Sequence, residues 1–264
     1  MAGPNKSLGQ HWLKDADVLT DIADSADLTK DDVVLEIGPG LGTLTSKLLA
    51  RAGSVVAVEF DADLARKLPK QFPGKNLTVT NEDILQFDLS QLASGYKVVA
   101  NVPYYITSKI VQRLSESKNP PQTMVLLVQK EVAERLAAKP GDYSILAIAA
   151  QIYYEVSLGS VVVAEFFTPP PKVDSQVVIM HRRPSPMVDE RLRAAFFQLV
   201  KAGFSAKRKK LRSSLAGGLR LSKSTVEELL KQANISADSR AEDLEINQWL
   251  TLLDKYDIIK DNLA

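Results

Sequence analysis

The chain has 264 residues, 45% hydrophobic and 25% charged, with a formal net charge of +1, which suits one large domain and a smaller one. It has no cysteine and only two histidines, His11 and His181, which excludes disulfides and cysteine-ligated zinc and argues against a histidine metal site or a Ser-His-Asp triad. The N-terminal residues lack the apolar core of a signal peptide, and no window reaches the length of a membrane span. We therefore expect a soluble cytoplasmic protein without a bound metal.

Strands alternate with helices through the first part of the chain. The apolar patterns predict strands at 33–37, 54–59, 77–80 and 97–100, and helices at 43–51 and 62–71. Further along, they predict a strand passing into a helix at 123–136, a buried helix at 143–154 and a late strand at 172–181, whose direction stays open. This alternation indicates an α/β protein with a parallel sheet.

The pattern changes after "RRPSPMVDE", in which two prolines mark a linker. Apolar residues then follow a helical spacing, and no strand pattern remains. Ser224 with Glu227, and Ser239 with Glu242, have the spacing of capping boxes. We predict two domains: an α/β domain at residues 1–184 and a small all-helical domain at residues 185–264.

Three glycines, Gly38, Gly40 and Gly42, fall in the predicted turn between the strand at 33–37 and the next helix. Glycine permits positive φ and lets a ligand approach the backbone beside a helix N-terminus. A dinucleotide fingerprint would place its third glycine at position 43, which is Thr43 here. Taken alone, the turn fits either nucleotide binding or an ordinary tight connection.

Two carboxylates follow the next two predicted strands. Glu59 ends the second strand, at the distance expected for a carboxylate that accepts hydrogen bonds from a ribose diol. Asp83 comes just after the third strand, where it could accept a hydrogen bond from an adenine amino group or simply cap a helix. Because the glycines and both acids share one rim, an adenosine-containing cofactor is favoured.

The stretch "VVANVPYYITSKIV" (98–111) ends a buried strand with an amide, a proline and two tyrosines. The Asn101 side chain and the Pro103 carbonyl could both accept hydrogen bonds from an exocyclic amine, which has two N–H donors. Tyr104 would add a flat ring on which a base can stack. The alternative is an Asx-type turn followed by a buried Pro-Tyr pair.

Six basic residues and no acidic one lie between Lys201 and Arg212. Such an excess suggests an anionic partner such as nucleic acid, although a charge run can also be a solvated face.

Six motifs in order carry a resemblance to a known family. They are "KSLGQHWL" (6–13), "EIGPGLGTLT" (36–45), "EDIL" (82–85), "NVPYYI" (101–106), "VQKEVAERL" (128–136) and "FTPPPKVDS" (167–175). Together with the basic segment at 195–215, they resemble the bacterial small-subunit ribosomal RNA adenine dimethyltransferases. Members of that family use S-adenosylmethionine to modify two adjacent adenosines near the 3′ end of the RNA.

The resemblance implies a Rossmann-like class I methyltransferase with a mostly parallel seven-stranded sheet and a helical RNA- or ribosome-binding domain. It also implies that the enzyme is a monomer and that its partner is small-subunit ribosomal RNA within an immature 30S-type subunit. The residues that it implies for the cofactor are His11, Leu13, Gly38, Gly40, Glu59, Asp83 and Asn101. Those that it implies for catalysis are Asn101, Pro103, Tyr104 and Phe167, and those for RNA are Lys207, Arg208, Lys209, Lys210 and Arg212.

The chain departs from the family at a few positions. The family commonly has Asn and Phe where this chain has His11 and Trp12, so a side-chain contact from His11 to the cofactor is in question. Val102 stands where Leu is usual. The family register favours Phe167 as a second stacking ring, with Phe166 as the alternative and Phe167 then in the core.

There are three rival functions, and "NVPY" with "FTPPPKVDS" argues against the second of them. The large-subunit RNA adenine methyltransferase that confers macrolide resistance shares these motifs. Protein-glutamine and DNA amino-methyltransferases usually have Asn-Pro-Pro-Tyr where this chain has "NVPY". The third is an RNA-binding assembly factor in which methyl transfer is secondary.

Overall fold

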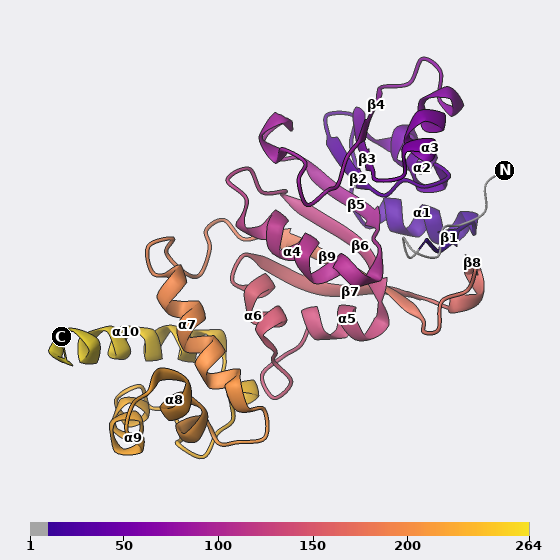
Figure 1. Ribbon diagram of the computed structural model, residues 1–264. Helices are drawn as coiled ribbons and strands as arrows, with labels where there is room; N and C mark the ends of the chain where they lie inside the picture. The colour runs from indigo at the N-terminus through magenta and orange to yellow at the C-terminus, as the bar shows by residue number, and fades with distance from the viewer. Residues whose placement is uncertain (1–9, 264) are drawn as a thin grey trace. The chain divides into compact units, whose positions relative to one another are not determined.

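The computed structural model describes residues 10–263 and divides the chain into two compact units (Figure 1). The first unit runs to residue 137 and also includes residues 154–183, whereas the second contains residues 138–153 and the chain from residue 184 onward. Among the described residues, no helix has both the length and the apolar character needed to cross a membrane.

A seven-stranded sheet forms the centre of the first unit. Its strand order is β4-β3-β2-β5-β6-β9-β7, and the neighbours from β4 to β6 run parallel. β9 is antiparallel to both β6 and β7, so the predicted mostly parallel sheet is confirmed and the open direction of the late strand is settled. The strands are β2 (Val33–Ile37), β3 (Ser54–Glu59), β4 (Leu77–Asn81), β5 (Lys97–Asn101), β6 (Thr123–Gln129), β7 (Tyr154–Val162) and β9 (Ser175–Arg182).

Both faces of the central strands are buried, as is usual for parallel sheets. Val34, Val55 and Val99 belong to the core cluster that contains the apolar sides of α1 and α2. Their neighbours along the strands, such as Leu35 and Val98, belong to the opposite face of the sheet and are equally buried. Only the ends of the strands therefore offer side chains to a ligand. The helices of this unit are α1 (Ala16–Asp24), α2 (Thr43–Arg51), α3 (Ala62–Lys67), α4 (Thr107–Glu116) and α5 (Lys130–Leu136).

A short second sheet joins two segments that are far apart in the sequence. β1 (Trp12–Leu13) pairs antiparallel with β8 (Phe167–Thr168), with Leu13 opposite Phe167. The His11 ring extends this contact, because its Nδ1 donates a hydrogen bond to the Pro169 carbonyl (2.7 Å). This pairing holds the N-terminal segment beside the carboxyl edge of the main sheet.

The second unit is helical, as predicted for the C-terminal part of the chain. Its helices are α6 (Ile145–Gln151), α7 (Arg193–Gly203), α8 (Leu211–Leu219), α9 (Lys223–Gln232) and α10 (Ile246–Leu263). Its core includes Phe196 and Trp249, which are fully buried, and the Trp249 ring stacks on Phe204 with centroids 6.0 Å apart.

The segment 138–153 is grouped with this second unit, whereas the sequence analysis placed it in the first domain. Backbone hydrogen bonds explain the difference. Gly141 and Tyr143 donate to the Glu242 carbonyl, and Met187 donates to the Ile152 carbonyl. These contacts join residues distant in sequence, so local apolar spacing does not reveal them.

Three local predictions differ from the structure. The helix predicted at 143–154 ends at Gln151, and Tyr154 begins β7, an unpredicted edge strand. The helix predicted at 62–71 changes to a 3₁₀ turn after Lys67, because Pro69 lacks the N–H that an α-helix needs. Neither predicted capping box forms, since Ser222 caps α9 through the Thr225 N–H and Arg240 precedes the 3₁₀ turn at Ala241–Asp243.

Two glycines of the second unit give a matched test of its packing. A methyl group on Gly203 would overlap the Trp249 ring, whereas one on Gly217 in α8 would meet no atom within 4 Å. Gly203→Ala should lower the free energy of unfolding by about 1–3 kcal/mol. Gly217→Ala should raise it by about 0.5–1 kcal/mol, because alanine favours the helix. Urea denaturation measures both, and equal effects of the two substitutions would contradict this packing.

Candidate functional site

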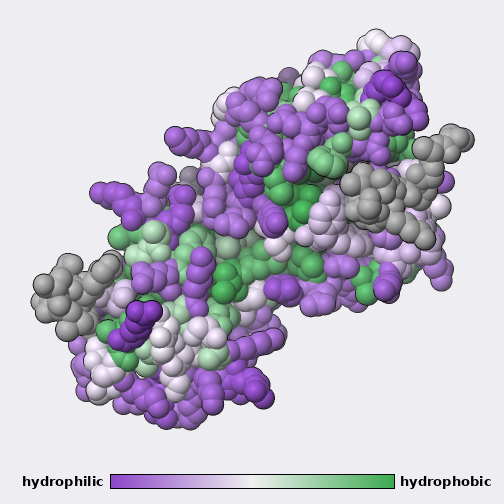
Figure 2. Space-filling view, in the orientation of Figure 1, coloured by the Kyte–Doolittle hydropathy of each residue, from purple (hydrophilic) through white to green (hydrophobic). Residues whose placement is uncertain are grey.

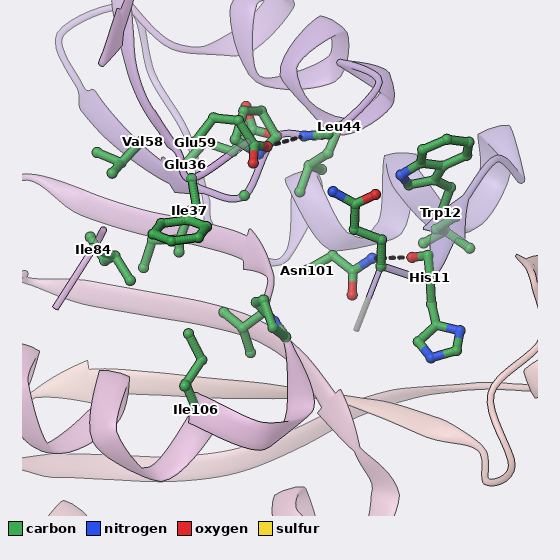
Figure 3. A pocket seen from close by; sticks show the side chains of 18 of the residues that line it. His11, Trp12, Glu36, Ile37, Leu44, Val58, Glu59, Ile84, Asn101 and Ile106 are labelled. Carbon is green, nitrogen blue, oxygen red and sulfur yellow. Dashed lines mark hydrogen bonds between the residues drawn. The ribbon is translucent and has the colours of Figure 1, made fainter. Parts of the chain in front are cut away.

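One pocket opens at the carboxyl edge of the sheet, lined by β1 and by the loops after β2, β3, β4 and β5 (Figure 3). Because these parallel strands end at the same edge, residues predicted from separate motifs come together here. The predicted residues in its lining are His11, Leu13, Gly38, Gly40, Glu59, Asp83, Asn101, Pro103 and Tyr104. Residues 6–9 of the first motif lie outside the described residues.

The glycines of the β2–α2 loop serve two different purposes. Gly38 has φ +64°, and a Cβ placed there would meet no protein atom within 4 Å, so the backbone is open to a ligand. Gly42, with φ +82°, precedes α2, and a Cβ there would press on Leu68 and Phe72 at 2.7 and 3.0 Å. The first glycine therefore suits ligand approach, whereas the third is required for packing.

Glu59 is held in place by two backbone donors. Its Oε2 accepts from the Gly40 N–H (3.0 Å) and its Oε1 from the Asp61 N–H (2.9 Å). A carboxylate has about four lone-pair positions, so each oxygen can still accept one more hydrogen bond. Burial raises the pKa of the Glu59 carboxyl, and the two N–H groups counteract that rise by stabilising the charged form. The geometry suits a diol.

Asp83 uses one carboxylate oxygen in a local turn and leaves the other free. Its Oδ1 accepts from the Leu85 N–H (2.9 Å), which caps a turn and not a helix. Its other carboxylate oxygen and the Ile84 N–H have no partner in the described part of the chain. An acceptor beside a donor matches the amino group and the adjacent ring nitrogen of adenine.

The Asn101 side chain has a fixed orientation. Its Nδ2 donates to the His11 carbonyl (3.2 Å), as the dashed line in Figure 3 shows. Its Oδ1 has no hydrogen-bond donor among residues 10–256, whose side chains are described. Asn101 therefore presents an acceptor at the end of β5, as an exocyclic amine would require.

The Pro103 carbonyl does not have the freedom that the sequence analysis assumed. It already accepts hydrogen bonds from the Ile106 N–H (3.2 Å) and the Thr107 hydroxyl (3.4 Å), which form the turn into α4. The preceding carbonyl, that of Val102, has no such partner in the described residues, and Val102 also lines the pocket. The free carbonyl next to Asn101 in the chain is thus that of Val102.

The Tyr104 ring is fixed at two places. Its hydroxyl shares a hydrogen bond with Ser175 (2.6 Å), and burial raises the pKa of that hydroxyl. The His11 ring stacks against it, with centroids 5.8 Å apart and planes 16° apart. His11 therefore lies against one face of Tyr104. His11 is itself held in place, because its ring nitrogen bonds to the Pro169 carbonyl and its own carbonyl accepts from Asn101.

Phe167 does not line the pocket. It is only 2% exposed and belongs to the core cluster with Leu13 and Leu127, whereas Phe166 is 42% exposed. In this conformation Phe167 has the core position that the sequence analysis gave as its alternative. Its stacking role stays a prediction.

A second acid, Glu36, lies buried behind the glycine loop. Its Oε2 accepts a hydrogen bond from the Thr45 hydroxyl (2.6 Å) in α2. Burial, with a smaller contribution from the charge of Glu59, raises the pKa of Glu36 to about 8 against the opposing hydrogen bond from Thr45. Sequence analysis did not single out Glu36, although an acid within a strand buried on both faces was a visible signal.

The five predicted RNA-binding residues lie in the second unit, and they fall into two groups. Lys210 pairs with Asp238 (2.8 Å), and Arg212 pairs with Glu227 (3.1 Å). Lys207, Arg208 and Lys209 are exposed in the turn before α8 and have no ion pair among the side chains described. The surface over α8 and α9 is mostly hydrophilic in Figure 2. The unpaired charges are therefore those at 207–209.

The fold and the pocket together define a class. A parallel sheet with a single antiparallel strand, a glycine loop after the first parallel strand and carboxylates after the next two is the arrangement of class I S-adenosylmethionine-dependent methyltransferases. Known structures agree. A dimethyladenosine transferase from Plasmodium falciparum matches with a TM-score of 0.82 and 27% identity, covering 94% of this chain and 98% of its own. The 23S rRNA methyltransferase ErmE matches with a TM-score of 0.76 and 30% identity, covering 93% and 99%.

Sequence comparison narrows the class. A profile of the family described as ribosomal RNA adenine dimethylase matches residues 2–257. A ribosomal RNA small subunit methyltransferase A from Dehalococcoides mccartyi strain CBDB1 is 42% identical over 255 residues, which cover 95% of this chain and 88% of the relative. Its counterpart in Alkaliphilus metalliredigens strain QYMF is 43% identical over 258 residues, covering 94% and 90%. The chain belongs to the ribosomal RNA adenine dimethylase family, and the predicted family and cofactor, S-adenosylmethionine, are confirmed.

The buried Glu36 predicts a pH-dependent stability. Its pKa is raised on folding, so the folded protein takes up a proton between about pH 4.5 and 8 and loses stability as the pH rises through that window. Glu36→Gln removes this loss. Its free energy of unfolding should exceed that of the parent by on the order of 3 kcal/mol at pH 8, and by little at pH 4.5.

Urea unfolding at both pH values measures the difference, with the exposed Glu134→Gln as the matched control. Parallel stability curves for Glu36→Gln and the parent would show that Glu36 stays ionised in the folded protein.

Proposed function

We propose that the protein transfers two methyl groups from S-adenosylmethionine to N6 of each of two adjacent adenosines near the 3′ end of small-subunit ribosomal RNA. The observation that carries this proposal is the pair of free acceptors, Asn101 Oδ1 and the Val102 carbonyl, beside a rim suited to adenosine. The names of the relatives support the small subunit as the substrate.

The pocket residues fit the cofactor in a definite direction. Asp83, Glu59 and Gly38 follow β4, β3 and β2, which are neighbours in the sheet, and Asn101 ends β5 on the far side of β2. The adenine would lie on Asp83 and the Ile84 N–H, and the ribose on Glu59. The methionyl part would then lie along the glycine loop. When bound, the cofactor supplies a methyl group activated by its positive sulfur.

Asn101 and Val102 would make N6 of the substrate a better nucleophile. The N6 lone pair is delocalised into the adenine ring, and two acceptors that bind its hydrogens favour a tetrahedral nitrogen with a localised pair. The same oxygens stabilise the positive charge that develops on N6 as it takes the methyl group. The charged product can release its proton to water, so no general base is needed. After the first transfer one N–H remains, for which one acceptor suffices.

Tyr104 would hold the extruded adenine by stacking on the face that His11 leaves free. Phe167 would need to leave its core position to provide a second ring, so its part is the weaker half of this arrangement. All of these residues come from the first unit of a single chain, so the site needs no residue from a second copy. The proposed enzyme is a monomer that acts in the cytoplasm on immature small subunits.

The two rival functions predict different products. The similarity to ErmE would suit a large-subunit substrate, but the relatives of higher identity carry the small-subunit name. An assembly factor would bind the subunit without needing Asn101. Incubating the protein and labelled cofactor with immature small subunits or with large-subunit RNA, followed by mass spectrometry of the RNA, separates them. We expect dimethyladenosine at two neighbouring positions of the small-subunit RNA, and label found only in large-subunit RNA would overturn the proposal.

Asn101 and Glu59 should affect different steps. Asn101→Ala should lower the turnover rate by ~100-fold or more with a far smaller change in cofactor Kd, because its interaction is strongest as charge develops on N6. Glu59→Ala should raise the cofactor Kd about tenfold, because the ribose loses a charged acceptor. Calorimetry and single-turnover rates at saturating cofactor measure the two quantities, and circular dichroism checks the fold. An Asn101→Ala variant with parental turnover would refute the polarising role.

The basic turn should contact phosphates. Changing Lys207, Arg208 and Lys209 together to alanine should weaken binding to the small subunit, and reduce the slope of log K against log salt by about 1 or more. The matched control changes Lys210 and Arg212, whose charges are already paired with Asp238 and Glu227, and should have a smaller effect. Equal salt slopes for the triple variant and the parent would mean that the turn does not touch RNA.

A further inference from the structure

Trp12 carries a buried hydrogen-bond donor that the structure leaves unused. Its Nε1–H is inaccessible to solvent and has no acceptor in the part of the chain that the structure describes. Buried polar groups are normally paired, because an unmade hydrogen bond costs free energy. Because Trp12 also lines the binding pocket, an acceptor on a bound ligand could satisfy this donor.

The indole lies against the part of the pocket where a ligand must approach the backbone. Trp12 lines the pocket, and a Cβ built on Gly40 would lie 3.6 Å from its Cδ1 and 3.7 Å from its Nε1. The backbone that carries the ring is fixed, because β1 pairs with β8 and the carbonyl of the neighbouring Leu13 accepts a hydrogen bond from the Thr43 hydroxyl (3.0 Å). Figure 3 shows the indole nitrogen on the side of Leu44 and Asn101.

The chemistry of the cofactor limits what this donor can bind. The adenine and ribose are assigned to the loops after β4 and β3, which leaves the methionyl part for the glycine loop after β2. That part carries an ammonium group, which only donates, and a carboxylate, which accepts. We infer that the Trp12 Nε1–H donates a hydrogen bond to the methionyl carboxylate of S-adenosylmethionine, and that it selects ligands which carry this group.

This role rests on the cofactor placement under the proposed function, and it is specific to the indole. A phenylalanine, which the family commonly has at this position, offers the same ring packing without an N–H. The second tryptophan of the chain provides a contrast. Trp249 Nε1 is also buried without a partner, but Trp249 is a core residue of the second unit and lines no part of this pocket.

The two tryptophans give matched variants, Trp12→Phe and Trp249→Phe. Each is titrated calorimetrically with S-adenosylmethionine and with decarboxylated S-adenosylmethionine, which lacks only the carboxylate. Trp12→Phe should raise the Kd for S-adenosylmethionine roughly tenfold, as expected for loss of a hydrogen bond to a charged group, and leave the Kd for the decarboxylated ligand within about twofold. Trp249→Phe should change neither Kd.

The Trp249→Phe variant also provides a spectroscopic readout, because Trp12 is then the one tryptophan left. Its fluorescence should shift on binding S-adenosylmethionine more than on binding the decarboxylated ligand. An unchanged Kd for Trp12→Phe, or an equal loss for both ligands, would overturn the inference and leave Trp12 with a packing role. Failure of the parent to bind either ligand would instead refute the cofactor placement.

Discussion

The hydrogen bond from Asn101 to the His11 carbonyl sets the chemistry of the site. An amide can present either its oxygen or its nitrogen to a ligand, and only the oxygen can accept from an amine. Because the His11 carbonyl takes the nitrogen, the oxygen is left as an acceptor for the pocket. His11 is itself held by the Pro169 carbonyl and by the pairing of β1 with β8. The orientation of the Asn101 amide thus depends on segments some 90 and 70 residues away in the chain.

The rim also concentrates negative charge where a cationic cofactor is expected. Glu59 is kept in place by the Gly40 and Asp61 N–H groups, which favour its ionised form against the effect of burial. Glu36 lies deeper and, with a pKa of about 8, is largely protonated at neutral pH. The proposed ribose acceptor is therefore the acid held by two backbone N–H groups, while the other acid is a structural link between β2 and α2 through Thr45.

The division between the two units matches the division of the proposed roles. The pocket residues belong to the first unit, whereas the unpaired basic residues at 207–209 belong to the second. Lys210 and Arg212 are tied to acids of their own unit, and the hydrogen bond from Lys210 lowers the pKa of Asp238. The run of basic residues thus offers fewer free positive charges than its length suggests, because acids of the same unit pair with part of it in the folded protein.

Sequence patterns were sufficient wherever the site depends on the ends of parallel strands. The glycine loop, Glu59, Asp83 and Asn101 were all placed correctly on one rim, because strand ends in a parallel sheet share an edge. What the patterns could not predict depends on contacts between distant segments or on backbone atoms. The free carbonyl is that of Val102 because the turn into α4 uses that of Pro103. Phe167 is buried because β8 pairs with β1, and the segment 138–153 joins the second unit through bonds to Glu242.

A crystal structure of the protein with S-adenosylhomocysteine and adenosine would test the central claim most directly. The quantity to measure is the position of the substrate N6 relative to the atoms at the end of β5. We expect N6 to lie about 3 Å from both Asn101 Oδ1 and the Val102 carbonyl oxygen, with Asn101 Nδ2 still bonded to the His11 carbonyl. An adenine amino group bound to the Pro103 carbonyl, or an Asn101 amide turned with its nitrogen toward the adenine, would contradict it.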